Sequence, residues 1–336
     1  MAAVIKLVAL WSAGLLLLVL AAAAVAYWYS LSLPGKSFAG APPPATDAER
    51  DLAARLRRHV EAIASEPHNV AHYEALQKSA AYIEGELRAV GYAPVAQVYE
   101  ADGKPVRNIA VELAPSTASA ATPTVVVGAH YDSYGNAPGA NDNGSGSAAV
   151  LELARLLKDT APRDKRLRLV LFVNEEPPYD RTPEMGSYRY AKSLKDAGEN
   201  VIGMISLETI GAFSDEPGSQ RYPFPFDLVF PDVANFVAFV ALPGGRSFLH
   251  EVVGGFRRHT PFPTIGGTAP DFVDGIGWSD HWAFYVLGYP AIMVTDTALF
   301  RYRDYHTPHD TPGKVDYGKL ARITLGIEAT LRDMLR

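Results

Sequence analysis

Apolar residues along the chain either recur with the period of a helix or form short continuous runs. From residue 47 they recur every three or four positions, and residues 73–90 repeat this spacing before Gly91, so both stretches are predicted helices. Further helices are predicted at 144–158, 186–197, 248–258 and 314–335. Apolar and β-branched runs predict buried strands at 108–113, 124–129, 168–174, 201–207 and 290–294.

The alternation of these strands with helices predicts the fold class. Continuous apolar strands are typical of parallel sheets that are covered on both faces. We therefore expect an α/β protein with three α/β/α layers around a mostly parallel, twisted sheet, formed by one domain at residues 47–336. Segments 212–233 and 260–280 are rich in Pro, Gly and aromatic residues and are long for plain connections, so we expect a rim or lid there.

The N-terminus carries an uncharged apolar stretch at residues 7–29. Roughly 20 apolar residues are enough to cross a bilayer, and Trp11 together with residues 27–29 (YWY) would place aromatic rings at both interfaces. We expect residues 1–33 to form one transmembrane helix that contacts the lipid bilayer through residues 7–29. A signal peptide cleaved near Ala26 is the alternative.

Both interpretations export the rest of the chain. The N-terminal amine and Lys6 precede the apolar stretch and Lys36 follows it, which weakly favours a cytoplasmic N-terminus. We therefore expect a single-pass membrane protein with its domain on the periplasmic or extracellular face, or else a secreted protein. Residues 34–46 are rich in Pro, Gly and Ala and are predicted to be a linker.

Composition narrows the chemistry that the domain can perform. The chain has no Cys, which excludes disulfides, thiol nucleophiles and Cys-ligated metals. Any metal must be held by His and carboxylate groups. The formal net charge of −6 argues against a nucleic-acid partner, which would require a basic face.

Ionisable residues collect where the predicted strands end. Ligands of open α/β sheets bind beyond the carboxyl ends of the strands. The residues that stand at these ends, or in loops expected to meet them, are His130, Asp132, Asp142, Glu175, Glu176, Glu208 and His306. Carboxylates gathered at one place repel each other, and two divalent ions would offset three of them and leave one for proton transfer. His and carboxylate groups suit Zn²⁺, with Mn²⁺ or Co²⁺ as alternatives.

Five motifs carry these residues: GAHYDS, PGANDNGSG, NEEPP, SLETIG and YHTPHDT. As an ordered set they resemble the zinc metallopeptidase family M28, whose members include aminopeptidases, and the resemblance covers most of residues 47–336. It implies a twisted sheet between helices, two Zn²⁺ ions with a single ion as the alternative, and a peptide substrate with a free N-terminal amine.

The resemblance also implies which residues hold metal. Asp142 would bridge the two ions, His130 and Glu208 would complete one site, and Glu176 and His306 would complete the other. Glu208 departs from the family pattern, which often has Asp at this position. Glu is one methylene longer, so it could ligate the metal, shift it or weaken its site.

Catalytic and substrate-binding roles follow in the same way. The resemblance implies that Glu175 is the general base, which takes a proton from metal-bound water and passes it to the leaving amine. It implies that Asp132 bonds the far nitrogen of His130 and fixes its tautomer. Segment 279–282 (SDHW) places Asp280 and His281 beside aromatic residues, and together with Tyr305 they are candidates for the substrate pocket. The alternative for this segment is a cap on the helix that follows.

Three functions are consistent with these residues. The first is a metal-dependent exopeptidase that removes the N-terminal residue of peptides through a metal-bound hydroxide. The second is a glutaminyl cyclase-like aminoacyltransferase with a single zinc ion, which the metal count would distinguish. The third is an inactive, receptor-like ectodomain, which would not bind zinc. The sequence leaves the preferred N-terminal residue and the oligomeric state open.

Overall fold

The computed structural model describes the backbone of the whole chain and every side chain except those of Ala2 and Ala3. The helices are α1 (Ala2–Leu31), α2 (Asp47–Ile63), α3 (Tyr73–Val90), α4 (Gly146–Leu157), α5 (Gly186–Asp196), α6 (Arg246–His259), α7 (His281–Val286), α8 (Ala298–Arg301) and α9 (Tyr317–Leu335). The strands are β1 (Val95–Ala101), β2 (Lys104–Leu113), β3 (Thr124–His130), β4 (Arg166–Phe172), β5 (Val201–Glu208), β6 (Val237–Ala241), β7 (Thr264–Thr268) and β8 (Ala291–Thr295). Short helical turns are η1 (Ala140–Ser145), η2 (Phe226–Leu228) and η3 (Pro312–Lys314).

The strands form one sheet in the order β1-β2-β4-β3-β5-β8-β6-β7. Its centre, β4-β3-β5-β8, is parallel as predicted. Strand β2 is antiparallel to both β1 and β4, and β6 is antiparallel to β8, so the complete sheet is mixed. The tight turn at residues 102–103 enforces the antiparallel pairing of β1 with β2, because a parallel pair needs a long crossover connection.

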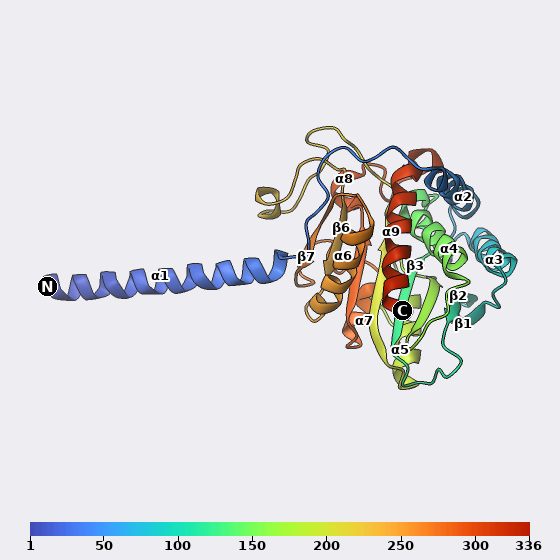
Figure 1. The fold of residues 1–336 in the computed structure, drawn as a ribbon, viewed down its shortest axis with the longest axis horizontal. Coiled ribbons are helices and arrows are strands. Elements are labelled where there is room, and N and C mark those ends of the chain that lie inside the picture. The colour runs from blue at the N-terminus through green and yellow to red at the C-terminus, as the bar shows by residue number, and fades with distance from the viewer.

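Helices cover both faces of the sheet, which confirms the predicted three-layer fold (Figure 1). Side chains of β3 alternate between two cores: Val125 and Val127 pack with residues of α2, α3, α4, α6 and α9, whereas Val126 packs with residues of α5 and α7. Because both faces are buried, the central strands are continuously apolar, which is the pattern that made them predictable.

Three strands were not predicted from the sequence. Strand β7 lies within segment 260–280, which was expected to form part of a rim or lid. Its sequence, TIGGT, contains two glycines and therefore lacks a β-branched apolar signal. Strand β1 lies at an edge of the sheet and alternates between exposed and half-buried side chains, and β6 is only five residues long.

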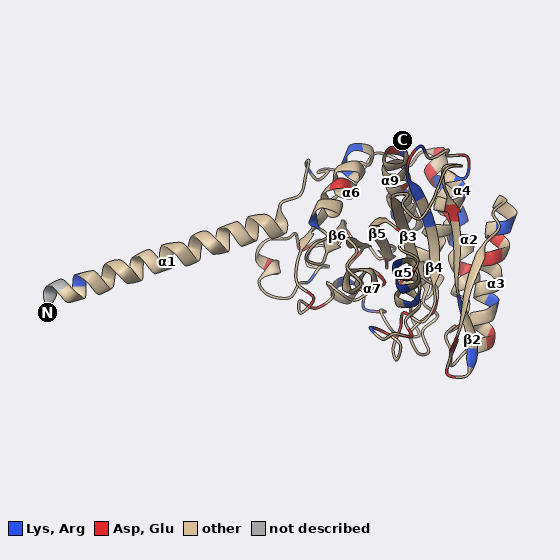
Figure 2. Cartoon of the chain, turned by 90° about the horizontal axis from the view of Figure 1, so that it is seen from below, with Lys and Arg blue, Asp and Glu red and all other residues tan. Residues whose placement is uncertain are grey.

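Helix α1 projects from the domain (Figure 1), and Figure 2 shows blue on it only near its N-terminal end, where the sequence has Lys6. The span Val4–Leu31 contains an 18-residue window with a mean hydropathy of 2.5, so the helix is long and apolar enough to cross a membrane. A signal sequence would pass the same test. The predicted linker, residues 34–46, has no helix or strand and lies along the domain, where Arg257 and Arg322 donate hydrogen bonds to its carbonyl groups.

Candidate metal centre

The candidate ligands meet at the carboxyl ends of the central strands. His130 is the last residue of β3 and Glu208 is the last residue of β5, and these strands are neighbours in the sheet. Glu175 and Glu176 follow β4, the other neighbour of β3. The strand ends thus bring together side chains that are far apart in the sequence.

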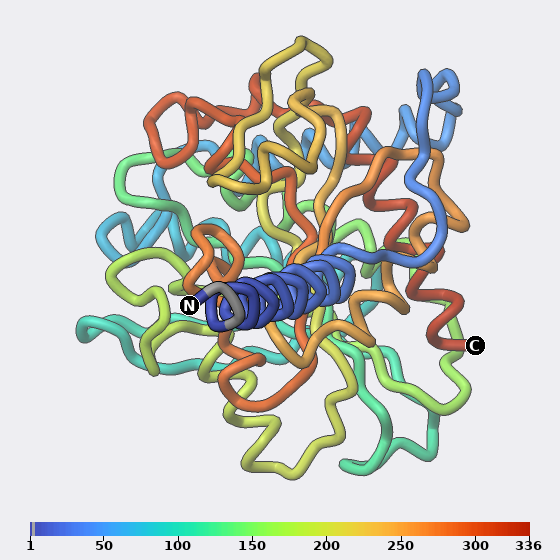
Figure 3. The backbone as a smooth tube through the Cα atoms, turned by 90° about the vertical axis from the view of Figure 1, so that its left-hand side faces the viewer, coloured from blue at the N-terminus to red at the C-terminus, as the bar shows by residue number. Residues whose placement is uncertain are grey.

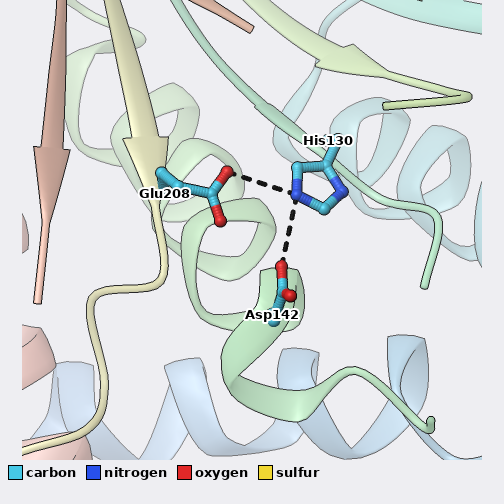
Figure 4. A group of neighbouring side chains, drawn as sticks. All are labelled: His130, Asp142 and Glu208. Atoms are coloured by element: carbon cyan, nitrogen blue, oxygen red, sulfur yellow. Dashed lines mark ion pairs between the residues drawn. The ribbon is translucent and has the colours of Figure 1, made fainter. Parts of the chain in front are cut away.

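One group consists of His130, Asp142 and Glu208 (Figure 4). Nε2 of His130 lies 3.4 Å from Oδ1 of Asp142 and 3.3 Å from Oε2 of Glu208. All three side chains are buried, and one ligand atom from each lies within 4.8 Å of the others. This spacing leaves room for an ion between them.

A second group consists of Asp142, Glu176 and His306. Nε2 of His306 lies 3.0 Å from Oδ2 of Asp142 and 3.4 Å from Oε1 of Glu176. Asp142 therefore presents one carboxylate oxygen to each group. A shared carboxylate of this kind is the arrangement expected between two neighbouring metal ions.

The unpaired atoms of both groups fit the coordination of metal ions. Nε2 of His130, Oδ2 of Asp142 and Oε1 of Glu176 are buried and have no hydrogen-bond partner. Buried polar atoms in folded proteins are nearly always paired, so an unmatched set that points to one place indicates a bound group. Nitrogen and carboxylate oxygen are suitable ligands for Zn²⁺. The residues present therefore fit divalent metal ions.

The charges of the two ligand groups also favour bound metal ions. Burial raises the pKa of Glu176 to about 8, with Asp142 adding to the shift, and burial also raises the pKa of Glu175 and Glu208. Burial opposes protonation of His306, but the neighbouring carboxylates of Asp142 and Glu176 outweigh it and raise the pKa of His306 to about 10. The site thus favours positive charge beside its carboxylates, which metal ions would supply.

Asp142 is fixed in place by backbone contacts of the turn that carries it. Its amide and that of Asn141 donate hydrogen bonds to the two oxygens of Asp310, at 3.1 and 2.9 Å. Tyr302 donates to the same carboxylate at 2.8 Å. Asp310 therefore supports the turn that presents Asp142.

Glu208 is held by two neighbouring side chains. Ser279 Oγ donates a hydrogen bond to Oε2 of Glu208 at 2.8 Å, and Nδ2 of Asn143 lies 3.4 Å from the same oxygen. The longer Glu side chain therefore reaches the group with His130 and is oriented by Ser279. The sequence offered no signal for this role, since Ser279 was noted only as part of the SDHW segment.

Asp132 contacts both His130 and the segment that carries Glu175 and Glu176. Nδ1 of His130 lies 3.1 Å from the main-chain oxygen of Asp132 and 3.7 Å from its carboxylate. The carboxylate accepts hydrogen bonds from the backbone amides of Glu175 and Glu176, at 3.1 and 3.3 Å. Asp132 thus orients the imidazole with its backbone and positions the two glutamates with its side chain.

Aromatic rings enclose His306. Tyr134 and Tyr305 stack on its imidazole with centroid separations of 3.9 and 3.8 Å. His306 has a φ of +57°, and Asn174 and Thr209, which adjoin Glu175 and Glu208, have φ of +60° and +45°. Non-glycine residues rarely adopt such angles, and they concentrate at functional sites.

The structure separates the three candidate pocket residues. Tyr305 lines an apolar pocket beside Glu208. The wall of this pocket also includes Ile276, Trp278, Met293 and Phe300. Asp280 and His281 are fully buried at the start of α7 and do not line this pocket. Nε2 of His281 lies 2.7 Å from the carbonyl oxygen of Ile276, so His281 holds a residue of the pocket wall in place. Asp280 occupies the N-cap position of α7 without a side-chain capping bond.

Asp296 was not considered from the sequence. It follows β8 directly, and its Oδ2 accepts hydrogen bonds from Asn141 Nδ2 at 3.0 Å and from the amides of Gly211 and Ala212 at 3.1 and 2.7 Å. It therefore joins the turn before Asp142 to the segment after Glu208. The strand-end position that singled out Glu208 would have singled out Asp296 as well.

Comparisons with known proteins give the family. The model of peptidase family M28 matches residues 108–238. The protein YfbL of Escherichia coli K12, itself uncharacterized, is 36% identical over 270 residues, which cover 78% of this chain and 81% of YfbL. Aminopeptidase YwaD of Bacillus subtilis is 35% identical over 153 residues, 45% of this chain and 32% of YwaD.

Two solved structures show that enzymes of two classes have this fold. BSAP, a zinc aminopeptidase from Bacillus subtilis, superimposes with a TM-score of 0.66 at 16% identity, covering 88% of this chain and 97% of BSAP. Glutaminyl cyclase of Fimbriiglobus ruber superimposes with a TM-score of 0.60 at 16% identity, covering 90% and 99%. The fold alone does not separate the two classes. The sequence relationship to YfbL and the family match confirm the resemblance carried by the motifs: this chain belongs to peptidase family M28.

Proposed function

We propose that this protein is a zinc-dependent aminopeptidase, which removes the N-terminal residue from peptides. The observation that carries the proposal is the pair of His–carboxylate groups that share Asp142. One group is completed by His130 and Glu208, and the other by Glu176 and His306. In this proposal each group holds one Zn²⁺ ion, and the apolar pocket beside Glu208 takes the N-terminal side chain.

Two such ions would polarise the scissile carbonyl group and lower the pKa of the attacking water. Glu175 takes the proton of that water and delivers it to the nitrogen of the leaving peptide. Its Oε2 lies 3.8 Å from Nε2 of His130, beside the metal ligands but in neither ligand group. The carboxylate of Asp132 fixes the backbone of Glu175 and Glu176, and so orients base and ligand together.

The test of this mechanism is the substitution Glu175→Gln. It preserves the shape of the side chain and all five ligands, so zinc content should stay unchanged while kcat falls by about 10²- to 10⁴-fold, as expected for loss of a general base. Glu184→Gln, at an exposed residue of the same region, is the matched control and should retain full activity. Normal cleavage of an aminoacyl-nitroanilide by the Glu175→Gln variant would contradict the assignment.

A glutaminyl cyclase is the second candidate, since an enzyme of that class shares the fold. Metal content and product analysis separate the two. Two zinc equivalents per chain and release of a free N-terminal amino acid support the peptidase. One equivalent, with pyroglutamate formed from a peptide that begins with Gln, supports the cyclase and overturns the proposal.

For the whole chain, α1 is proposed to remain attached as a membrane anchor that holds the domain outside the cytoplasm. Its exposed apolar surface and the aromatic residues Tyr27, Trp28 and Tyr29 at its end support this proposal. N-terminal sequencing of the protein from membranes tests it. A mature chain that begins near residue 27 would show a cleaved signal peptide instead.

A further inference from the structure

The end of α1 is fastened to the catalytic domain by Arg246 of α6. Its guanidinium group donates hydrogen bonds to the carbonyl oxygen of Tyr29 and to Oγ of Ser32, both at 2.8 Å. The same group lies over the ring of Tyr29, 4.6 Å from its centroid. Arg246 therefore bonds to both the last turn of α1 and the residue that follows it.

The chain beyond α1 is bound to the same side of the domain. Arg257 donates hydrogen bonds to the carbonyl oxygens of Pro34 and Gly35, at 3.0 and 3.1 Å. The amide of Thr264, in β7, donates to Oγ of Ser37 at 2.8 Å. Because of these contacts, the segment that follows α1 is bound to the domain and is not a flexible linker. The direction of α1 thus determines which face of the domain looks toward the membrane, and Figure 3 shows that face along the helix axis.

The level of the membrane surface follows from the aromatic residues of α1. Tyr27, Trp28 and Tyr29 are exposed and occupy the last turns of the helix. Aromatic side chains of this kind concentrate at the boundary between the hydrocarbon core and water. Parts of the domain that reach the last turn of α1 therefore reach the headgroup region of the bilayer.

Segment 222–230 (YPFPFDLVF) has such a position. Tyr222 and Phe226 of this segment line the same pocket as Leu31, and the gold-coloured turn in Figure 1 lies near the domain end of α1. Within this segment Phe224 is 80% exposed and Leu228 is 74% exposed, and Asp227 is its one charged residue. Phe272, 83% exposed, adjoins Val273, which shares an apolar pocket with Phe226. We call Phe224, Leu228 and Phe272 the apolar rim. Exposed apolar clusters of this kind mark contact surfaces.

Two neighbouring pockets lie between this face and the candidate metal centre. The pocket behind the apolar rim has Leu31, the last residue of α1, on its wall. A second pocket shares residues with it and extends to the candidate ligand Glu208. The shared residues are Val240, Asp274, Ile276, Thr297 and Phe300. The pocket that reaches the metal centre thus adjoins the pocket lined by Leu31, at the end of the membrane helix.

From these observations we infer that the apolar rim rests in the headgroup region of the bilayer that α1 crosses, so that the substrate pocket opens against the lipid surface. Apolar burial rather than charge holds the contact, because Asp227, Asp271 and Asp274 lie in the same segments and would not attract anionic lipid. The inference rests on the proposed anchor and peptidase activity. The substrates it implies are peptides that adsorb to the membrane through their own apolar residues.

Site-specific fluorescence tests the lipid contact on the full chain, which has no native Cys. Single variants Phe224→Cys, Leu228→Cys and Phe272→Cys carry an environment-sensitive fluorophore in phosphatidylcholine vesicles. Val98→Cys is the control, since Val98 is also exposed, at 62%, but lies on β1 at the opposite edge of the sheet. Nitroxide-labelled lipid should quench the three rim probes at least about threefold more than the probe at residue 98.

Other outcomes of this measurement overturn the inference. Equal quenching at the rim and at residue 98 would show that the rim does not touch lipid. Rim probes shielded from both nitroxide lipid and aqueous iodide would show that protein, such as a second copy of this chain, covers the rim. Neither readout requires catalysis, so an inactive but lipid-contacting protein would contradict the proposed function and not the membrane contact.

A kinetic comparison tests the consequence for the substrate. The triple variant with Phe224→Ser, Leu228→Ser and Phe272→Ser should retain kcat/KM for a soluble aminoacyl-nitroanilide. For a lipid-tailed peptide in the same vesicles it should lose at least about tenfold. Equal effects on both substrates, or none on either, would refute a role of the apolar rim in access from the membrane.

Discussion

The hydrogen bond from Ser279 to Glu208 allows one of the two proposed zinc sites to be weakened selectively. Ser279→Ala removes a buried donor 2.8 Å from Oε2 of Glu208. A hydrogen bond to a charged group contributes about 1.5–3 kcal/mol, which corresponds to a factor of about 10 to 100 in metal affinity at about 1.4 kcal/mol per tenfold. Asn143 Nδ2 lies 3.4 Å from the same oxygen and offers a partial replacement. We therefore expect the lower end, about tenfold.

Zinc titration of the metal-free protein against a competing chromophoric chelator measures this effect. One of two zinc equivalents should bind about tenfold more weakly in Ser279→Ala, and the other should keep its wild-type affinity. Ser206→Ala is the graded control, since Ser206 Oγ lies 2.8 Å from Ser279 Oγ and contacts Glu208 only through it, so its effect should be smaller. Equal weakening of both equivalents, or unchanged affinity, would refute the reasoning that Ser279 orients one ligand.

Three further predictions address the site and the fold. Asp142→Asn removes the shared carboxylate, so both zinc equivalents should be lost together in metal analysis; retention of one would show that Asp142 does not bridge. Burial lowers the pKa of His281 to about 4, below its usual 6.5, so the folded protein binds fewer protons than the unfolded chain between these pH values. The free energy of unfolding should therefore fall by up to about 3 kcal/mol as pH falls from about 6.5 to 4. In the metal-free protein, His281→Gln should make the free energy of unfolding depend less steeply on pH in this range than it does in the wild type. Equal slopes for variant and wild type would contradict a neutral, buried His281. Gly266 has a φ of +151°, and a Cβ there would lie 1.8 Å from the carbonyl oxygen of Phe239, so Gly266→Ala should destabilise by at least about 1–3 kcal/mol in urea unfolding. Gly85→Ala, in helix α3 with open space at its Cβ, should instead be neutral or stabilising by up to about 1 kcal/mol, and similar effects of the two substitutions would refute the steric argument.

The central fold and the set of candidate ligands were predictable because their signals are local. Continuous apolar runs predicted β3, β4, β5 and β8, since strands buried on both faces are apolar along most of their length. The strand-end rule then led from these strands to His130, Glu175, Glu176 and Glu208. Strands β1 and β7 were not predicted because an edge position and glycines weaken the pattern, whereas β6 is as short as β8 and equally apolar, so its sequence does not explain the omission.

Residue type and position in the sequence therefore determined the family, the fold class and the candidate ligands of this protein. Only the tertiary structure decided how these side chains meet: that Asp142 presents one oxygen to each ligand group, that Ser279 orients Glu208, and that Asp280 is buried outside the pocket while Trp278 lines it. The reason is physical. Local sequence determines which residues stand at the end of a strand, but the distances between strand ends and loops depend on the packing of segments far apart in the sequence, such as those of Asp142 and Asp310, which are 168 residues apart.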